Sequence, residues 1–304
     1  MSELILHHFD PSPFAEKIRL IFGLKKLEWR SVDIPMIMPK PLLTALTGGY
    51  RKTPVLQVGA DVYCDTSLIA LELNKRFPKP DLFTDGNQGL ALALSYWSNT
   101  VFFNPGAGLS MGTNADLPEP ILKDRSEFFN FMDFGLLQEE IPHLFTQLLP
   151  HIDLVEKQLS DGRAFLMGSS AGWADINAYF VIWMLRANVA PIQEMLTNCH
   201  SMDAWEKRMQ DIGHGKRSEL DAGNALRIAK ASCPSDTEGV DSADPLGLNE
   251  GDKIIVEPDD YGKVPVSSEL IGLNRQTVSI RRNSAETGDL NIHFPRAGFR
   301  ITRC

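Results

Sequence analysis

The first eighty residues combine short apolar runs with segments in which apolar residues recur at helical spacing. Residues 3–7 form an apolar run typical of a buried strand, and residues 14–22 show helical spacing. Residues 29–34 indicate a second strand, and residues 53–63 indicate two strands joined by a tight turn. A further helical stripe follows and ends before two prolines. The pattern predicts strand–helix–strand, then strand–strand–helix, over residues 1–80.

The rest of the chain has a helical part and a strand-rich end. Residues 88–231 carry apolar residues at helical spacing in several segments, and residues 174–185 are apolar nearly all round, which predicts a central buried helix. Residues 232–252 contain no Lys or Arg, several acidic residues and many turn formers, so we expect a flexible linker. Period-two patterns over residues 253–304 predict a small antiparallel sheet or barrel.

These patterns divide the chain into expected domains. We assign residues 1–80 to an α/β domain, residues 88–231 to an all-helical domain, and residues 253–304 to a small β domain that follows an acidic linker over residues 232–252. Because a flexible linker leaves the β segment independent, we expect that deletion of residues 234–304 leaves a folded two-domain protein.

Composition and charge exclude several classes of function. The chain has 304 residues, of which 43% are hydrophobic, as is typical of packed globular domains. Its formal net charge of −9 disfavours nucleic acid and anionic membrane as partners, because those surfaces are themselves negative. Scattered cysteines without metal-ligand spacing, and no apolar stretch long enough to cross a bilayer, predict a reduced, cytoplasmic protein without a metal site.

Short motifs in the first domain carry the strongest chemical signal. The motif S-P-F-A-E-K-I-R-L at residues 12–20 follows the first strand. The motif T-P-V-L lies at residues 53–56, and C-D-T at residues 64–66 begins a helix. In this order and spacing the motifs resemble those of the glutathione transferase superfamily, most closely its tau and omega classes.

The resemblance implies a fold, an activity and partners. It covers residues 4–77 well, residues 88–231 weakly and the β segment not at all. It implies a thioredoxin-like α/β domain and an all-α domain of the glutathione S-transferase type, which with the terminal strands make an α+β multidomain protein. It also implies glutathione as co-substrate, a small hydrophobic electrophile as second substrate, and a homodimer.

The resemblance further implies how glutathione is bound. The peptide bond before Pro54 is usually cis in thioredoxin-like folds, which leaves the backbone of Thr53 free to pair with the cysteinyl backbone of glutathione. Asp65 and Thr66 begin a helix whose N–H groups and dipole suit the γ-glutamyl carboxylate, and Asp65 faces the γ-glutamyl amine. The alternative is that this pair only caps the helix. The expected glutathione-binding residues are Lys40 and Lys52 for the glycyl carboxylate, together with Thr53, Pro54, Asp65 and Thr66.

Ser12 is the candidate catalytic residue. It stands just before the first helix, where the omega class has a cysteine and the tau class a serine. A hydroxyl that donates to the glutathione sulfur, together with the helix N-terminus, favours the nucleophilic thiolate. Serine at this position favours conjugation over a mixed disulfide, which requires cysteine. The alternative is that Ser12 serves only as the helix cap.

The resemblance also suggests residues for the second substrate. His8 ends the first strand, and Trp97 and Phe102 belong to the first helix of the helical domain, where aromatic side chains could line the pocket for the electrophile. The alternatives are a structural histidine and ordinary core aromatics.

Three functions remain open at this point. The first is a glutathione transferase that activates the thiol through Ser12. The second is a non-catalytic module of the same fold that binds a ligand or a protein. The third is a specialised glutathione-dependent isomerase, dehalogenase or lyase. Only the module could function without Ser12.

Overall fold

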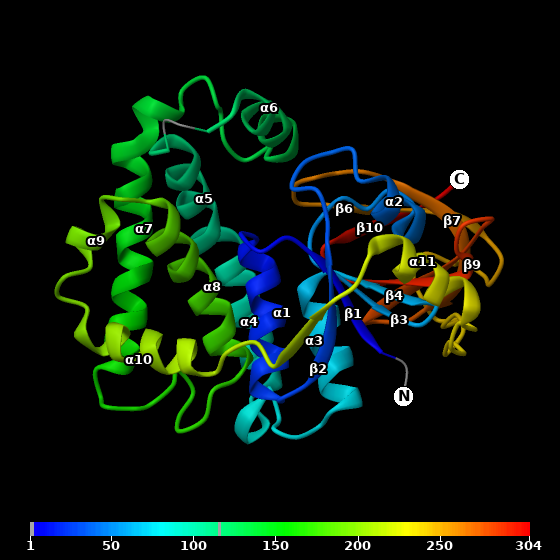
Figure 1. Cartoon of the computed structure of the whole chain (residues 1–304), viewed down its shortest axis with the longest axis horizontal. Helices are drawn as coiled ribbons and strands as arrows, with labels where there is room; N and C mark the ends of the chain where they lie inside the picture. Colours follow the sequence, from blue (N-terminus) through cyan, green and yellow to red (C-terminus); the bar gives the residue numbers. More distant parts are fainter. Residues whose placement is uncertain (1–2, 115–116) are drawn as a thin grey trace. The chain divides into compact units, whose positions relative to one another are not determined.

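The computed structural model describes residues 3–114 and 117–304 and divides the chain into two compact units (Figure 1). The first unit contains Met1–Ile18, Leu27–Glu72 and Lys216–Cys304. The second contains Arg19–Lys26 and Leu73–Gly215. The first unit therefore combines the N-terminal and the C-terminal parts of the chain.

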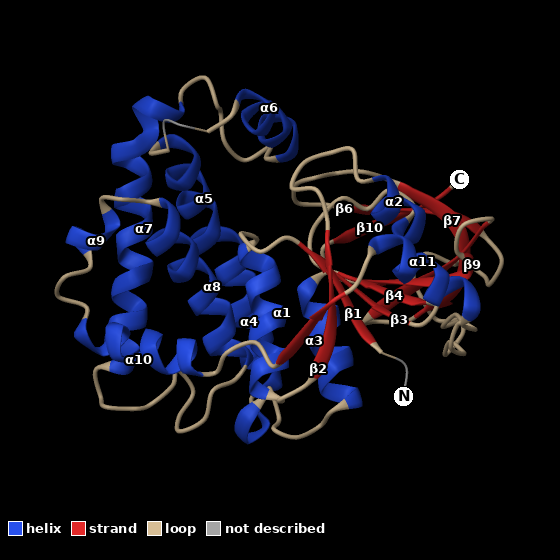
Figure 2. Cartoon of the chain, viewed as in Figure 1, coloured by secondary structure: helices blue, strands red, loops and turns tan. Residues whose placement is uncertain are grey.

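The first unit is built on one sheet, which has ten strands within the described residues (Figure 2). Their order is β10-β6-β7-β8-β9-β4-β3-β1-β2-β5. The strands are β1 (Leu4–His8), β2 (Glu28–Asp33), β3 (Val55–Val58), β4 (Asp61–Cys64), β5 (Lys216–Glu219), β6 (Lys253–Pro258), β7 (Val266–Leu273), β8 (Thr277–Ser284), β9 (Gly288–Pro295) and β10 (Phe299–Arg303).

The N-terminal part of this sheet confirms the expected thioredoxin-like arrangement. Strand β1 pairs in parallel with β2 and antiparallel with β3, and β3 and β4 form the expected hairpin. The helices of this part are α1 (Pro13–Leu24), α2 (Pro41–Thr47) and α3 (Thr66–Arg76). Two later elements also belong to this unit: β5, which pairs in parallel with β2, and helix α11 (Ala222–Ala231). Residues 216–231, expected with the helical domain, thus contribute to the sheet unit.

The C-terminal strands form the expected antiparallel sheet, and this sheet continues the N-terminal one. Strand β9 pairs in parallel with β4, where Val62 lies opposite Ile292 and Tyr63 opposite His293. Strands β8, β7, β6 and β10 follow outward in antiparallel pairs. Strand β4 would otherwise present unpaired backbone groups at an edge, and β9 satisfies them.

One hydrophobic core lies along this sheet and includes residues from both ends of the chain. Helices α2 and α11 contact one another, and α11 also packs on β9. The core contains Leu46 of α2, Val62 of β4, and Ile280 and Phe294 of the C-terminal strands. Tyr50 lies with its ring centroid 5.7 Å from that of Phe294. The C-terminal strands therefore bury side chains of the N-terminal part.

The acidic segment 232–252, expected as a flexible linker, makes defined contacts with the sheet. The Ser235 N–H and hydroxyl both donate to the Asp61 carboxylate, the hydroxyl at 2.6 Å, and Asn291 Nδ2 donates to the Ser235 carbonyl at 2.7 Å. The Thr237 hydroxyl donates to the Ile271 carbonyl at 2.8 Å. Composition suggested solvation, but here the polar groups of the segment pair with polar groups of the sheet.

The second unit is helical, as expected (Figure 2). Helix α8 contacts α4, α5 and α10, and most of its side chains are buried, which confirms the predicted central helix. The elements of this second unit are η1 (Thr84–Gly86), α4 (Gln88–Trp97), the π-helical segment η2 (Ser98–Phe102), α5 (Phe103–Gly112), α6 (Glu119–Phe128), α7 (Leu137–Leu159), α8 (Trp173–Asn188), α9 (Ile192–Met195) and α10 (His200–Asp211).

The start of α8 is held by one buried carboxylate. Asp175 accepts hydrogen bonds from the N–H groups of Leu166 at 2.7 Å and Gly172 at 3.0 Å, and from Trp205 Nε1 at 2.9 Å. The bond from Gly172 is one half of a capping box, and the bond from Trp205 ties α10 to α8.

We predict that a chain truncated after Cys233 is insoluble or loses cooperative melting, because it exposes the edge of β4 and the apolar core face around Tyr50 and Val62. This reverses the expectation from the linker composition. Soluble yield and thermal melting followed by circular dichroism test it, with a chain that lacks only Cys304 as control. A soluble truncated protein that melts like the full chain would contradict it.

We predict that Asp61→Asn lowers the free energy of unfolding by about 1–3 kcal/mol at pH 6, the range for a buried hydrogen bond to a charged group. Burial raises the pKa of Asp61, but hydrogen bonds from His293 and Ser235 outweigh burial, so this pKa lies below its ordinary value of 3.8. The ionised form therefore stabilises the fold above pH 3.8, and this contribution disappears as the pH falls through the depressed value.

Urea unfolding of both proteins between pH 6 and pH 2 measures this effect. The difference in unfolding free energy between the wild type and Asp61→Asn should shrink toward low pH. Asp289→Asn, on the exposed part of β9, is the matched control and should change the unfolding free energy only slightly at pH 6. A constant difference for Asp61→Asn would show that its charge is not what stabilises the fold.

Candidate functional site

Ser12 caps helix α1 at the end of the turn that follows β1. Its hydroxyl oxygen accepts a hydrogen bond from the Ala15 N–H at 3.2 Å, and its carbonyl accepts one from the Glu16 N–H at 3.1 Å. The residue is only 3% exposed. Pro13 occupies the first helical position, where its missing N–H costs nothing. Because a serine hydroxyl can accept and donate at once, its proton remains able to reach a further acceptor.

Lys40, Thr53 and Pro54 lie together beside this turn. The Lys40 ammonium donates to the Thr53 hydroxyl at 3.2 Å and lies 5.5 Å from the centroid of the Phe9 ring. Phe9 in turn accepts a hydrogen bond from the Ser12 N–H through its carbonyl, at 3.1 Å. The Thr53–Pro54 peptide bond is cis, as the resemblance implied. Lys40 thus connects Thr53 to the turn that precedes Ser12.

Asp65 and Thr66 form the N-terminus of α3, which begins at Thr66. Asp65 has a φ of 76°, a left-handed conformation that is uncommon outside glycine, and its carboxylate accepts from the Ser67 N–H at 2.8 Å. Thr66 is buried. Burial lowers the pKa of Lys17 on α1 well below its usual range, and the charge of Asp65 opposes this effect. Lys17 of α1 and Asp65 before α3 are therefore close enough for their charges to interact.

Lys52 is held by a loop of the C-terminal strands. Its ammonium forms an ion pair with Asp260 and lies 4.2 Å from the centroid of the Tyr261 ring. Sequence reasoning missed both partners, which lie in the loop between β6 and β7. No local signal could have found them, because 208 residues separate Lys52 from Asp260 and only the tertiary fold brings them together.

His8 lies in the interior of the first unit rather than on a surface. Its Nε2 lies 3.0 Å from the Ser31 hydroxyl, and its ring centroid lies 5.5 Å from that of Trp29. Its neighbour His7 bonds Gln57 at 2.8 Å, and burial lowers the pKa of His7 to about 4, although that hydrogen bond raises it. These contacts are those of structural histidines. A role for His8 in binding the second substrate stays a prediction.

Trp97 and Phe102 pack together in the helical unit. Their rings stack with centroids 5.0 Å apart, and Trp97 Nε1 donates to His151 Nδ1 at 3.2 Å. His151 on α7, which the sequence did not single out, also lies 5.8 Å from the Phe102 ring, and burial lowers its pKa. The structure therefore brings the two predicted aromatics together around a histidine. Their role with an electrophile stays a prediction.

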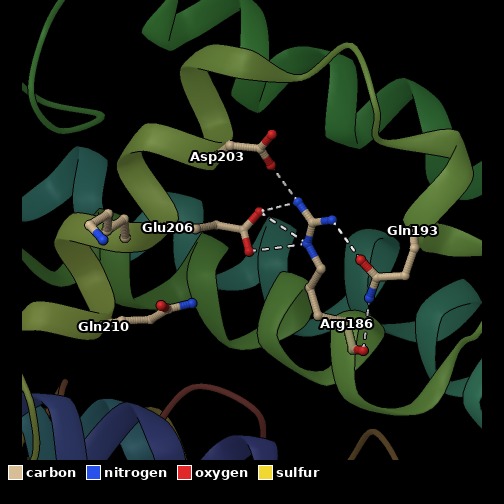
Figure 3. Close-up of a pocket in the computed structure, with 6 residues that line it drawn as sticks. Arg186, Gln193, Asp203, Glu206 and Gln210 are labelled. Carbon is tan, nitrogen blue, oxygen red and sulfur yellow. Dashed lines mark hydrogen bonds and ion pairs between the residues drawn. The ribbon is translucent and has the colours of Figure 1, made fainter.

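A pocket of about 380 Å³ lies in the helical unit, between α8, α9 and α10 (Figure 3). Arg186 lines this pocket. The Arg186 guanidinium donates to Glu206 at 2.8 Å, to Asp203 at 2.6 Å and to Gln193 at 2.9 Å. These groups satisfy one another and join three helices, so we interpret the cluster as a structural ion-pair network. The pocket contains none of the residues that the sequence predicted.

The described parts of the chain lack both a cluster of metal-ligand side chains and a membrane-length apolar helix. Among residues 3–114 and 117–304, no group of three or more His, Cys, Asp or Glu side chains is placed to hold a metal ion. Over the same residues, no helix combines the length and the apolar character needed to cross a bilayer.

The geometry suits glutathione at two of its three parts. The N-terminus of α3, with the buried Thr66 hydroxyl, presents N–H groups that suit a carboxylate, and Lys40 connects the Thr53 hydroxyl to Phe9 in the turn before Ser12. The glycyl end fits less well, because Lys52 already pairs with the Asp260 carboxylate. The residues present therefore fit the γ-glutamyl and cysteinyl parts of the tripeptide.

Known proteins share both the sequence pattern and the fold. Residues 6–81 match the family of glutathione S-transferase N-terminal domains, and residues 138–211 match that of glutathione S-transferase C-terminal domains. No curated protein matches the sequence significantly. A crystal structure of a GST-like protein from Pseudomonas syringae aligns over 100% of both chains with 35% identity and a TM-score of 0.82.

More distant structures share the fold over part of the chain. The tau class glutathione S-transferase of mango, Mangifera indica, is 15% identical, covers 69% of this chain and 92% of its own, and has a TM-score of 0.53. Gtt2 from Saccharomyces cerevisiae is 18% identical, covers 68% and 95%, and also has a TM-score of 0.53. The family domains and the full-length match together show that this chain belongs to the glutathione S-transferase superfamily.

Proposed function

We propose that this protein is a glutathione transferase in which Ser12 stabilises the thiolate of bound glutathione for attack on a small hydrophobic electrophile. The observation that carries this proposal is the position of Ser12 at the buried N-terminus of α1, where its hydroxyl accepts a hydrogen bond from the helix and can still donate one. Family membership supports glutathione as the ligand. The chemistry of Ser12 is inferred from its geometry.

The physical task of the site is to ionise a thiol at neutral pH. A free thiol has a pKa of about 8.5 and is therefore mostly protonated at pH 7. The Ser12 hydroxyl, already polarised by the Ala15 N–H, can donate a hydrogen bond to the thiolate sulfur, and the positive end of the α1 dipole favours the anion. The thiolate then forms a carbon–sulfur bond as the leaving group departs with the electron pair of its bond.

The remaining predicted residues would hold the tripeptide in place. Thr66 and the N-terminus of α3 would bind the γ-glutamyl carboxylate, with Asp65 near the γ-glutamyl amine, and the Thr53 backbone would pair with the cysteinyl residue. Lys40, which already contacts Thr53, would add positive charge. Trp97, Phe102 and His8 remain candidates for the electrophile, and a cytoplasmic homodimer remains part of the proposal.

A non-catalytic binding module is the second candidate. It is favoured by the hydrogen bond between Ser12 and Ala15, because a helix cap needs no ligand. A specialised glutathione-dependent isomerase, dehalogenase or lyase would use the same thiolate and so shares the predictions for Ser12. Calorimetric titration with glutathione, combined with thiolate absorbance across pH, separates the enzymes from the module: enzymes bind with a depressed thiol pKa, and a carrier binds with a normal one.

We predict that Ser12→Ala raises the pKa of bound glutathione by about one unit and lowers turnover of an aryl halide about tenfold at neutral pH, because one hydrogen bond to the thiolate is lost. Affinity for glutathione should change little. Ser12→Thr, which keeps a hydroxyl and can cap the helix, is the matched control and should retain a depressed pKa.

The same substitution removes a helix cap, which costs about 1 kcal/mol of stability, so a melting curve must accompany the kinetics. The thiolate absorbance of the bound complex reports the ionisation directly and is independent of the electrophile chosen. Full turnover and an unchanged thiol pKa in folded Ser12→Ala would show that another group activates the thiol.

We predict that Thr66→Val weakens glutathione binding by about 1–2 kcal/mol, the cost of a hydrogen bond to a charged group. The buried hydroxyl of Thr66 at the start of α3 is the reason for this expectation. Thr66→Ser retains the hydroxyl and should bind as the wild type does. Isothermal titration calorimetry gives both values. Equal affinities for the valine variant and the wild type would place the γ-glutamyl carboxylate elsewhere.

A further inference from the structure

The segment between α2 and the Thr53–Pro54 loop is held by the C-terminal strands. Gly48 has a φ of 72°, and a Cβ at that position would lie 2.9 Å from Val266 Cγ1 of β7. Arg282 Nε of β8 donates to the Ala45 carbonyl at 3.3 Å. Tyr50 packs against the rings of Phe294 and Phe299. The backbone that leads to Lys52 is therefore shaped by strands that follow it by two hundred residues.

The loop between β6 and β7 reaches the same segment with two side chains. Asp260 forms the ion pair with Lys52, and the Tyr261 ring lies beneath the ammonium at 4.2 Å. The Tyr261 side chain is buried, whereas Asp260 is 45% exposed and Lys52 only 13%. The aromatic ring fixes the ammonium, and the carboxylate faces solvent beside it.

This loop lies close to the proposed glutathione site. Burial raises the pKa of Tyr50 well above its usual range, and the charges of Asp65 and Asp260 both add to that rise. Tyr50 therefore lies within electrostatic reach of the N-terminus of α3 and of the β6–β7 loop. Since Lys52 directly precedes Thr53, a tripeptide paired with the Thr53 backbone would place its glycyl end near this ion pair.

The positive charge of Lys52 is consequently already neutralised by the Asp260 carboxylate. A free glycyl carboxylate that approached Lys52 would meet the Asp260 carboxylate at the same ammonium, and two like charges at short range repel. An amide at this end carries no charge, so it avoids the repulsion, and its N–H can donate to Asp260. The pair is therefore better suited to a neutral glycyl end than to an anionic one.

We propose that the β6–β7 loop is a specificity element of the thiol-binding site. In this proposal Asp260, through its ion pair with Lys52, selects a glutathione derivative whose glycyl carboxylate is masked as an amide. This inference rests on the proposed function, because it assumes that the γ-glutamyl and cysteinyl parts bind at Thr66 and Thr53. It assigns to the C-terminal strands a role that the sequence did not indicate.

The test compares two thiols on the full-length protein by isothermal titration calorimetry. The probes are glutathione and γ-glutamyl-cysteinyl-glycinamide, which differ only at the glycyl end, where a neutral amide replaces the carboxylate. The wild type should bind the amide at least about threefold more tightly than glutathione, as expected for one partly screened repulsion between carboxylates. Asp260→Asn should raise the affinity for glutathione about tenfold and leave that for the amide nearly unchanged.

Asp259→Asn is the matched control, because it removes an equal charge from the same loop. Asp259 is exposed, and its backbone N–H donates to the Gly298 carbonyl at 3.0 Å. The control should keep the wild-type preference for the amide. Melting curves of both variants verify the fold, which substitution of an exposed side chain should preserve.

Two results would overturn the inference, and they are distinguishable. If both thiols bind and Asp260→Asn leaves their affinity ratio unchanged, or if the wild type prefers glutathione, the specificity role of Asp260 is wrong while the proposed function stands. If neither thiol binds to any of the folded proteins, the proposed function is wrong and the inference falls with it.

Discussion

Strand β9 lies parallel to β4, and the other features of the first unit depend on that pairing. It satisfies the backbone groups that β4 would otherwise expose, and it places Ile292 beside Val62, so that one core continues from the N-terminal helices to the C-terminal strands. Asp61 and His293 add a polar contact at the same junction. Because an added sheet cannot pivot about a shared strand ladder, the loops of the C-terminal strands acquire fixed positions beside the N-terminal motifs.

Some residues of the candidate site are positioned by their local sequence, and others by residues that are distant in the chain. The ends of α1 and α3 supply Ser12 and Thr66 through helix termini, which present N–H groups and a positive dipole whatever the remainder of the chain does. Lys52 differs, since Asp260 and Tyr261 determine its surroundings. The two helix N-termini thus depend on local sequence, whereas the surroundings of Lys52 depend on an extension of the same sheet.

The elements and the site were predictable to different degrees. Helix α8 was evident because its apolar residues surround the helix, and Ser12 and Thr66 were evident because caps leave a local signature. The segment around Ser235 was expected to be solvated, since composition records polarity and does not record that Asp61 and Asn291 are its partners. Strand β5 lies in the part expected to be all-helical, because its four exposed residues acquire strand geometry only by pairing with β2.

By itself, the sequence determined the order of strands and helices over the first eighty residues, the helical character of the second unit, and the identity of the residues at the two helix N-termini, because each depends on contacts between near neighbours in the chain. Only the tertiary structure decided that the C-terminal strands extend the first sheet and that Asp260 reaches Lys52. Those contacts join residues about two hundred positions apart. Such pairings are selected by the burial of a common core, and the pattern of one segment does not show which other segments share that core.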